Sequence, residues 1–166
     1  LGHMAVKLAK AMGATVTSIT HSKNKVDAAT EMGADHVLLS TDEHAMEAAM
    51  GSMDLIINTI PVKHDLNPYL PLLDVKGTLV IVGQVGAMEE TNTVPIVMGR
   101  RTIAGSLIGG VKETQEVLDF CAKHNIHPDC EMIRMDQINE AFSRLEKGEV
   151  PHRLVIDMAS LNTEAA

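Results

Sequence analysis

Residues 55–82, with the sequence LIINTIPVKHDLNPYLPLLDVKGTLVIV, decide the fold class. The runs Leu55–Thr59 and Thr78–Val82 are short, continuous and apolar, which is typical of parallel strands buried on both faces. Between them, the stretch Leu66–Leu73 is interpreted as helical. A strand, a helix and a second strand in this order form a crossover unit, and such units build parallel sheets.

The same alternation extends on both sides of this unit. Upstream we expect a helix from residue 2 or 3 to Met12, a strand over Thr15–Thr20, a helix over Lys23–Met32, a strand over His36–Leu39 and a helix over Glu43–Met50. Downstream we expect a strand over Ile103–Ile108 and a helix over Glu113–Lys123. Because crossovers between parallel strands are right-handed, the sequence predicts an α/β fold with a doubly wound parallel sheet.

The pattern changes in the last part of the chain. Short strands are predicted over Glu131–Arg134 and His152–Ile156, with an amphipathic helix around Ile138–Leu145 between them. These elements need not belong to the main sheet, and they could pair with elements outside this chain. We therefore divide the chain into residues 1–127 and residues 128–166.

Composition excludes several classes of protein. The 166 residues carry a formal net charge of −8, and only 2% are aromatic. These values argue against a nucleic-acid-binding surface and against aromatic platforms for single strands. No apolar run approaches the roughly 20 residues of a membrane span, so no membrane partner is expected. Two cysteines, Cys121 and Cys130, form no disulfide framework, which indicates a reducing cytoplasm.

Ligands of doubly wound sheets bind at the carboxyl ends of the strands. Gly2 stands at the start of the first helix, where a glycine lets a pyrophosphate approach the helix N-terminus; an ordinary N-cap glycine is the alternative. A helix at residue 2 with no strand before it also suggests that a strand and further glycines precede this sequence; a tag remnant, which Gly2-His3-Met4 resembles, is the alternative. The loops Gly83–Gly86 and Gly105–Gly110 follow predicted strands and could bind a nicotinamide through main-chain groups, or be plain turns.

The end of the second predicted strand bears on the type of dinucleotide. A site that prefers NAD places an acid there for the ribose 2′-hydroxyl, but no acid occurs from Val16 to Asn24. The segment instead contains hydroxyl groups and cations: Thr20, His21, Ser22, Lys23 and Lys25. Such groups suit the 2′-phosphate of NADP(H), and a solvated polar turn is the alternative.

Four cysteine and histidine residues near the end of the predicted helix have the spacing of a possible metal motif. Cys121, His124, His127 and Cys130 form a C-x-x-H-x-x-H-x-x-C string, and tetrahedral zinc accepts such ligands. However, Cys121 falls on the apolar face of a predicted helix, and His124 fits its C-terminal cap. We therefore predict no metal ligands and no catalytic residues within this sequence.

Several segments together resemble one known family. Leu1-Gly2-His3-Met4-Ala5 is similar to the end of the glycine-rich turn of zinc-dependent medium-chain alcohol dehydrogenases. The segments Asn58–Val62, Gly77–Val80, Arg101–Ser106, Glu113–Glu116 and the ending from Asp136 to Arg153 resemble the cinnamyl-alcohol-dehydrogenase branch. The resemblance covers about residues 1–158. It implies a Rossmann-type domain, NADP(H) as cofactor, and alcohols or aldehydes as substrates.

The resemblance also implies roles for particular positions. Leu1 and Gly2 match the pyrophosphate turn; Thr20, His21 and Lys25, with Ser22 and Lys23 beside them, match the 2′-phosphate site; Thr59, Val82, Gly83, Ser106 and Ile108 match the nicotinamide wall; and Arg153 matches an arginine that reaches the pyrophosphate. It further implies a homodimer that pairs through the strand near Ile103–Leu107.

The same resemblance describes what lies outside this sequence. Catalytic zinc is expected only in an N-terminal domain that is missing here, and residues 128–166 are expected to return to that catalytic domain. The family's strand order, 3-2-1-4-5-6, implies a break where the first strand would lie. The sequence thus indicates the cofactor-binding part of an NADP(H)-dependent enzyme, inactive alone. A non-catalytic dinucleotide-binding or dimerisation module and a methyltransferase-like enzyme are the alternatives.

Overall fold

The computed structural model describes residues 1–84, 86–147, 149–150 and 153–162. By its contacts the chain splits into two compact units, Leu1–His124 and Asn125–Ala166. All of its strand pairs are parallel within the described residues. The α/β class with parallel sheets is therefore confirmed, whereas the functional assignment of residues 1–127 and 128–166 stays a prediction.

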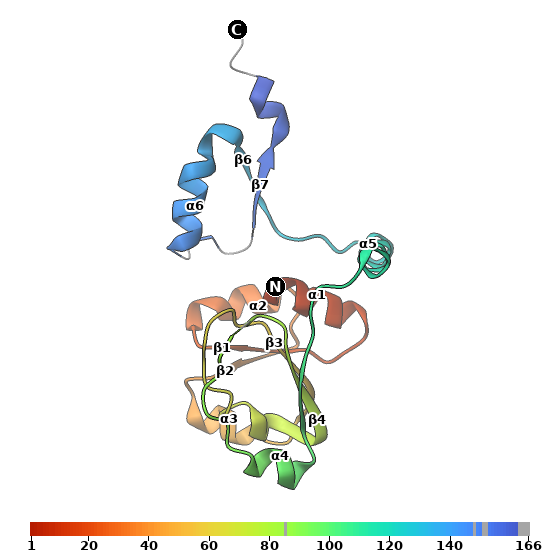
Figure 1. The fold of residues 1–166 in the computed structure, drawn as a ribbon, viewed down its shortest axis with the longest axis vertical. Helices are drawn as coiled ribbons and strands as arrows, with labels where there is room; N and C mark the ends of the chain where they lie inside the picture. Colours follow the sequence, from red (N-terminus) through yellow and green to blue (C-terminus); the bar gives the residue numbers. More distant parts are fainter. Residues whose placement is uncertain (85, 148, 151–152, 163–166) are drawn as a thin grey trace. The chain divides into compact units, whose positions relative to one another are not determined.

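The first unit opens with a helix and then alternates strands and helices (Figure 1). Its first elements are α1 (Gly2–Ala11), β1 (Thr17–Thr20), the 3-10 turn η1 (Lys23–Lys25), α2 (Val26–Glu31), β2 (His36–Leu39) and α3 (Glu43–Ala48). β1 and β2 pair in parallel from Thr17 opposite His36 to Thr20 opposite Leu39. Asp42 caps α3, because its Oδ1 accepts the N–H of Ala45 at 3.0 Å. These elements lie where the sequence predicts them, except that η1 replaces the first turn of the second helix.

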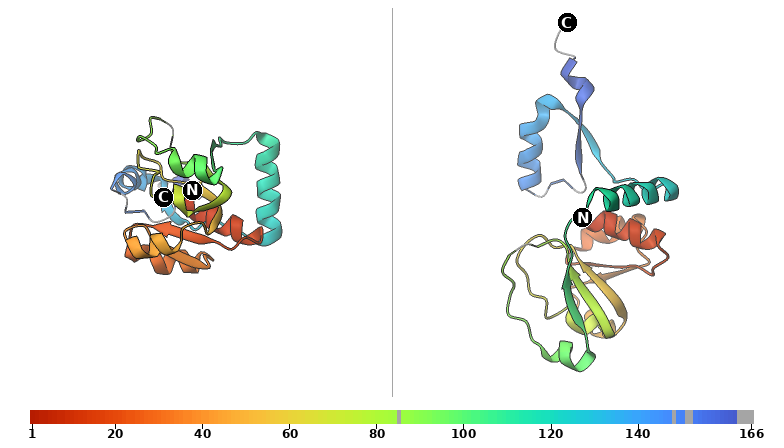
Figure 2. Two further views of the ribbon diagram at one scale, coloured as in Figure 1. Left: turned by 90° about the horizontal axis from the view of Figure 1, so that it is seen from below. Right: turned by 45° about the vertical axis from the view of Figure 1, so that its right-hand side comes forward.

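The remaining elements of this unit build a second sheet. They are β3 (Met53–Asn58), the 3-10 turn η2 (Leu70–Leu72), β4 (Leu73–Ile81), α4 (Val94–Gly99), β5 (Thr102–Gly105) and α5 (Val111–His124). The strand order is β3-β4-β5, and the register runs from Leu55 opposite Thr78 to Asn58 opposite Ile81. Figure 2 shows these strands side by side within the unit.

Two predictions for this sheet need correction, and one helix was missed. The helix expected over Leu66–Leu73 is only the single turn η2, because Pro68 and Pro71 lack the N–H groups that a helix requires. The strand expected over Ile103–Ile108 ends at Gly105, since its partner β4 ends opposite it at Ile81. The short helix α4 was not predicted, because its apolar sequence VPIVMG has no polar face to reveal a helical period.

One apolar core joins the two sheets. Its buried members come from both sides of the unit: Leu38 in β2, Met46 in α3, Ile56 in β3, Leu79 in β4, and Leu66, Leu70, Leu72 and Leu73 between β3 and β4. Although the core is shared, the sheets β1-β2 and β3-β4-β5 are separate. Within the described residues, β1 pairs only with β2 and β3 only with β4, so no strand joins the two sheets. This is the break that the family strand order implies.

The second unit contains its own pair of strands. Its elements are β6 (Glu131–Arg134), the 3-10 turn η3 (Met135–Gln137), α6 (Ile138–Glu146), β7 (Leu154–Asp157) and the 3-10 turn η4 (Met158–Asn162). β6 and β7 pair in parallel, with Glu131 opposite Leu154. Arg144 ties α6 to β6 through two hydrogen bonds of 2.8 Å to the carboxylate of Glu131. The last strand was expected to begin at His152, which lies outside the described residues, and the separate pairing agrees with the changed sequence pattern.

Candidate functional site

The carboxyl ends of β3 and β4 and the start of α1 approach each other closely. A Cβ on Gly83 would lie 2.4 Å from the carbonyl carbon and oxygen of Thr59, far inside ordinary contact. A Cβ on Gly2 would lie 3.4 Å from the Thr59 hydroxyl oxygen. The structure thus brings together three of the predicted site residues, with Thr59 between Gly2 and Gly83. At position 83 the backbone of β3 leaves no room for a side chain.

The start of α1 has the features of an anion site. No side chain caps this helix, and its first turn contains no acidic residue. The Ala5 N–H donates to the Leu1 carbonyl at 3.1 Å, whereas the first N–H groups of a helix have no acceptor within it. The positive end of the helix dipole adds to this preference for a negative group. The donor set therefore fits a phosphate group beside Gly2.

The segment after β1 presents hydroxyl and amino groups. Thr20 Oγ1 accepts the N–H of Ser22 at 3.2 Å, and the Ser22 carbonyl accepts the N–H of Lys25 at 3.1 Å. These bonds bend the chain directly after the strand, where His21, Lys23 and Lys25 are exposed. No carboxylate occurs before Asp27 in this turn. The donor set again fits an anion, here one at the carboxyl end of β1.

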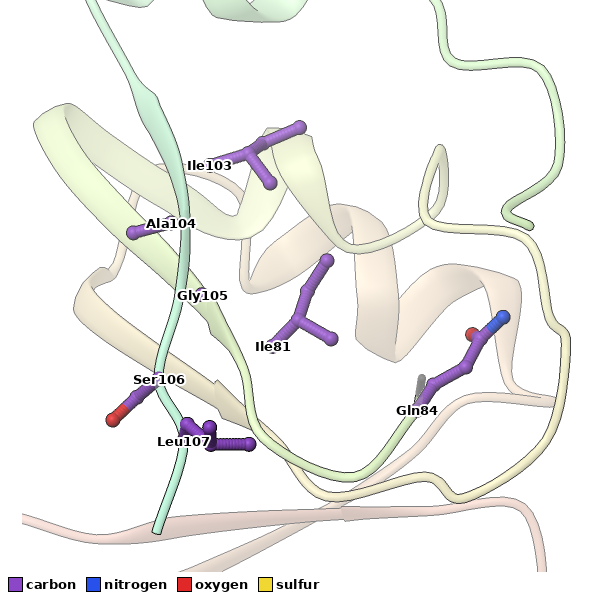
Figure 3. A pocket seen from close by; sticks show the side chains of 7 residues that line it. All are labelled: Ile81, Gln84, Ile103, Ala104, Gly105, Ser106 and Leu107. Carbon is purple, nitrogen blue, oxygen red and sulfur yellow. The ribbon is translucent and has the colours of Figure 1, made fainter. Parts of the chain in front are cut away.

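A shallow depression of about 550 Å³ lies at the carboxyl ends of β4 and β5 (Figure 3). It is lined by Ile81, Gln84, Ile103, Ala104, Gly105, Ser106 and Leu107. Of the predicted nicotinamide-wall residues, only Ser106 is among them. Ile108 is 90% exposed and lies outside the depression. Gln84 and Leu107 belong to the glycine loops noted in the sequence, although their side chains were not predicted to line a site.

The other two predicted cofactor-binding residues are Val82, which follows β4, and Arg153, which precedes β7. Val82 is half-buried, and its N–H donates to the Asn58 carbonyl at 3.0 Å, so it holds β4 against β3. Arg153 belongs to the second unit, where its carbonyl accepts the N–H of Glu131 at 2.9 Å and its side chain is exposed. Its contact with a pyrophosphate stays a prediction.

Sequence reasoning missed Asn58 as a functional residue. It is the buried polar residue of the described part of the chain, at 6% exposure. Its Oδ1 accepts the N–H of Ile60 at 3.1 Å, and its Nδ2 lies 2.7 Å from Nε2 of His64. The available signal was a polar residue that ends a continuous apolar strand directly before Thr59.

An ion pair between the last turn of α1 and the residue before β2 stabilises the fold. Lys10 of α1 donates to Asp35 at 2.5 Å, and the Val16 N–H donates to the other carboxylate oxygen at 2.8 Å. The hydrogen bond from Lys10, followed by that from Val16, lowers the pKa of Asp35.

Among the described residues, no group of three or more His, Cys, Asp or Glu side chains could hold a metal ion. The His124 ring of the C-x-x-H string lies against the Phe120 ring, with centroids 4.2 Å apart and planes tilted by 30°.

Comparison with known proteins identifies the family. The profile of the zinc-binding dehydrogenases matches residues 1–123. The chain belongs to the zinc-binding dehydrogenase family. A probable mannitol dehydrogenase from Medicago sativa is 52% identical over 161 residues, which are 96% of this chain and 45% of that protein. The chain thus spans about half the length of the curated relatives that it matches.

Solved structures indicate which branch of the zinc-binding dehydrogenases this chain resembles. A cinnamyl alcohol dehydrogenase from Sorghum bicolor has a TM-score of 0.89 and 43% identity, over 96% of this chain and 45% of that one. A cinnamyl alcohol dehydrogenase from Helicobacter pylori, complexed with NADP(H), has a TM-score of 0.75 and 39% identity, over 94% and 44%. The cinnamyl-alcohol-dehydrogenase-like branch of the zinc medium-chain enzymes is confirmed. Among the described helices, none has the length and apolar character to cross a membrane.

Proposed function

We propose that this chain is the NADP(H)-binding part of a zinc-dependent alcohol dehydrogenase that interconverts small alcohols and aldehydes. The observation that carries the proposal is the close approach of Gly2, Thr59 and Gly83 at the uncapped start of α1. Glycines at a helix start and at a strand end leave space for a dinucleotide backbone. The names of the relatives support the same reaction class.

Each part of the cofactor has a matching donor set. Leu1 and Gly2 would hold the pyrophosphate through main-chain N–H groups, and Ser106 would face the nicotinamide from the depression beyond β5. When bound, the nicotinamide supplies or accepts a hydride, while zinc held by a separate domain polarises the substrate oxygen. The residues of this chain bind and orient the cofactor; we propose that alone they do not catalyse the reaction.

The preference for NADP(H) over NAD(H) rests on the turn after β1. A carboxylate at this position would accept hydrogen bonds from a ribose 2′-hydroxyl and would repel a 2′-phosphate. Here Thr20 and Ser22 provide hydroxyl groups, and Lys25 provides an exposed cation. Binding of NADP(H) by the Helicobacter pylori relative supports the same preference.

Titration with NADPH and NADH tests the proposal. The chain has no tryptophan, so nicotinamide fluorescence can be followed against a low background. We expect NADPH to bind more tightly than NADH, and Lys25→Ala to weaken NADPH by about tenfold, as for the loss of one charge-assisted hydrogen bond. Lys112→Ala removes an equal charge from α5, where Lys112 pairs with Glu116 at 3.8 Å, and serves as control. Equal affinities for both dinucleotides would refute the NADP(H) preference, and no binding by a folded chain would favour the non-catalytic dimerisation module.

Assembly into a homodimer is a further part of the proposal. The outer edge of β5 has no strand partner within the described residues. Leu107, directly beyond this edge, is 82% exposed. An unpaired strand beside exposed apolar side chains favours pairing with a second copy.

The free thiols of Cys121 and Cys130 support a cytoplasmic location.

A further inference from the structure

The segment between β3 and η2 is held by a small network around Asn58. The Asn58 side chain bonds to Ile60 N–H at 3.1 Å and to His64 Nε2 at 2.7 Å, and His64 Nδ1 lies 2.7 Å from the Val62 carbonyl. The main-chain carbonyl of Asn58 accepts the N–H groups of Val82 and Gly83 at 3.0 and 3.2 Å. One buried residue therefore ties β3, β4 and the following loop together.

The hydrogen-bond partners decide the state of the His64 ring. A carbonyl oxygen only accepts, so Nδ1 carries the proton that it donates to Val62. Nε2 of the neutral ring is then an acceptor, and Asn58 donates to it from Nδ2. This orientation of the amide leaves Oδ1 as the acceptor for the Ile60 N–H. Every donor faces an acceptor only when His64 is neutral with its proton on Nδ1.

The network fixes the backbone on both sides of Thr59. Asn58 precedes Thr59 and is held within the sheet, whereas Ile60 follows it and is held by the Asn58 amide. The Thr59 carbonyl packs against Gly83, and its hydroxyl faces the start of α1 at Gly2. A displacement of Ile60 would therefore move Thr59 relative to both glycines.

Resting on the proposed function, we propose that Asn58 and His64 are positioning residues that hold Thr59 in place for the dinucleotide. Neither side chain needs to touch the cofactor. Because the network lies at the ends of β3 and β4 rather than in the turn after β1, it acts on NADPH and NADH alike. It contributes to affinity for the dinucleotide and not to the choice between the two.

Substitutions at His64 separate positioning from mere bulk. Glutamine has one acceptor and one donor and can replace both ring contacts, whereas leucine can replace neither. We expect His64→Leu to weaken NADPH and NADH by the same factor, about tenfold, as for one unsatisfied buried partner. We expect His64→Gln to stay within about threefold of the original chain for both. His44→Leu, at an exposed position of α3, is the matched control and should change neither affinity.

The outcomes distinguish this inference from the proposed function. If the unsubstituted chain binds both dinucleotides but His64→Leu binds them equally well, or His64→Gln fails as His64→Leu does, the positioning role is refuted alone. If each variant binds NADPH and NADH with equal affinity, and His64→Leu weakens both while His64→Gln does not, the NADP(H) preference is refuted while the positioning role stands.

A spectroscopic measurement keeps the test independent of how the variants fold. Long-range proton–nitrogen spectra of the unsubstituted chain near neutral pH should show His64 with Nδ1 protonated and Nε2 bare. The Thr59 and Ile60 amide signals should shift when NADPH is added. A ring protonated on Nε2, or unchanged Thr59 and Ile60 signals at saturating NADPH, would overturn the inference.

Discussion

Replacement of Gly83 by alanine is the sharpest test of the site geometry. The added Cβ would lie 2.4 Å from the carbonyl carbon and oxygen of Thr59 and 2.7 Å from the Ile60 carbonyl oxygen. Ordinary contact begins near 3.4 Å, so the ends of β3 and β4 would have to separate by about 1 Å. All the atoms that the new methyl group meets are backbone atoms, which cannot rotate away as a side chain can.

The energetic cost follows from what this separation breaks. Asn58 accepts the N–H groups of Val82 and Gly83 at 3.0 and 3.2 Å, and both bonds would be lengthened beyond useful range. Each is worth about 1 kcal/mol net, and overpacking adds about 1–3 kcal/mol. We therefore expect Gly83→Ala to lower the free energy of unfolding by about 3–5 kcal/mol. Because Thr59 would also be displaced relative to Gly2, NADPH affinity should fall at least tenfold, or by about 1.4 kcal/mol.

Urea titration followed by far-ultraviolet circular dichroism measures the stability change. Both chains are compared at one protein concentration, because self-association contributes to stability. Gly105→Ala, at the end of β5, is the matched control: its Cβ would meet nothing within 4 Å, so the expected change is within about 0.5 kcal/mol. An equally small change for Gly83→Ala would refute the close approach of β3 and β4 at Thr59.

Three further outcomes are expected. The pKa of Asp35 is lowered in the folded chain by its hydrogen bonds from Lys10 and Val16. The stability that Asp35 contributes is therefore present above the unfolded carboxyl pKa and is lost as the pH falls through the folded pKa. Asp35→Asn should flatten this acid dependence of stability in urea titrations, and an unchanged slope would contradict the prediction. In the described part of the chain, β1 and β3 each have one edge without a strand partner, which should cause the isolated chain to self-associate; a cooperatively unfolding monomer in sedimentation and melting experiments would contradict this. The chain with NADPH and added zinc should not reduce aldehydes, and sustained loss of nicotinamide absorbance would show that catalysis needs no other domain.

Much of the fold follows from patterns that are local in the chain. The strands His36–Leu39 and Glu131–Arg134 have the predicted boundaries, because β-branched and apolar runs between turn residues need no distant contact to be recognised. The helices α5 and α6 were predicted from the helical period of their apolar and polar residues, and the structure extends the expected Glu113–Lys123 to Val111–His124. One failure is also local, because Pro68 and Pro71 forbid the helix expected before β4, whereas the early end of β5 at Gly105 depends on its partner strand.

Some residues of the candidate site were indicated by sequence motifs, whereas their arrangement was shown only by the structure. Motifs in the sequence pointed to Gly2, to the turn Thr20–Lys25 and to the glycine loops after the strands, because these features depend on residue type and order. The structure placed Ser106 in the depression, left Ile108 outside it, and joined Gly2, Thr59 and Gly83. The cofactor roles of these residues remain predictions until the titrations are done.

The amino-acid sequence alone was enough to predict a parallel α/β chain that resembles the zinc-binding dehydrogenases, because hydrophobic periodicity and motifs depend on residues that are close together in the sequence. Packing decided the rest. Whether Gly83 is an ordinary turn glycine or a forced one depends on where the Thr59 backbone passes, and whether His64 is a surface histidine or a partner of Asn58 depends on the loop that turns it back. Distances between segments arise only when the core closes, so no local pattern contains them.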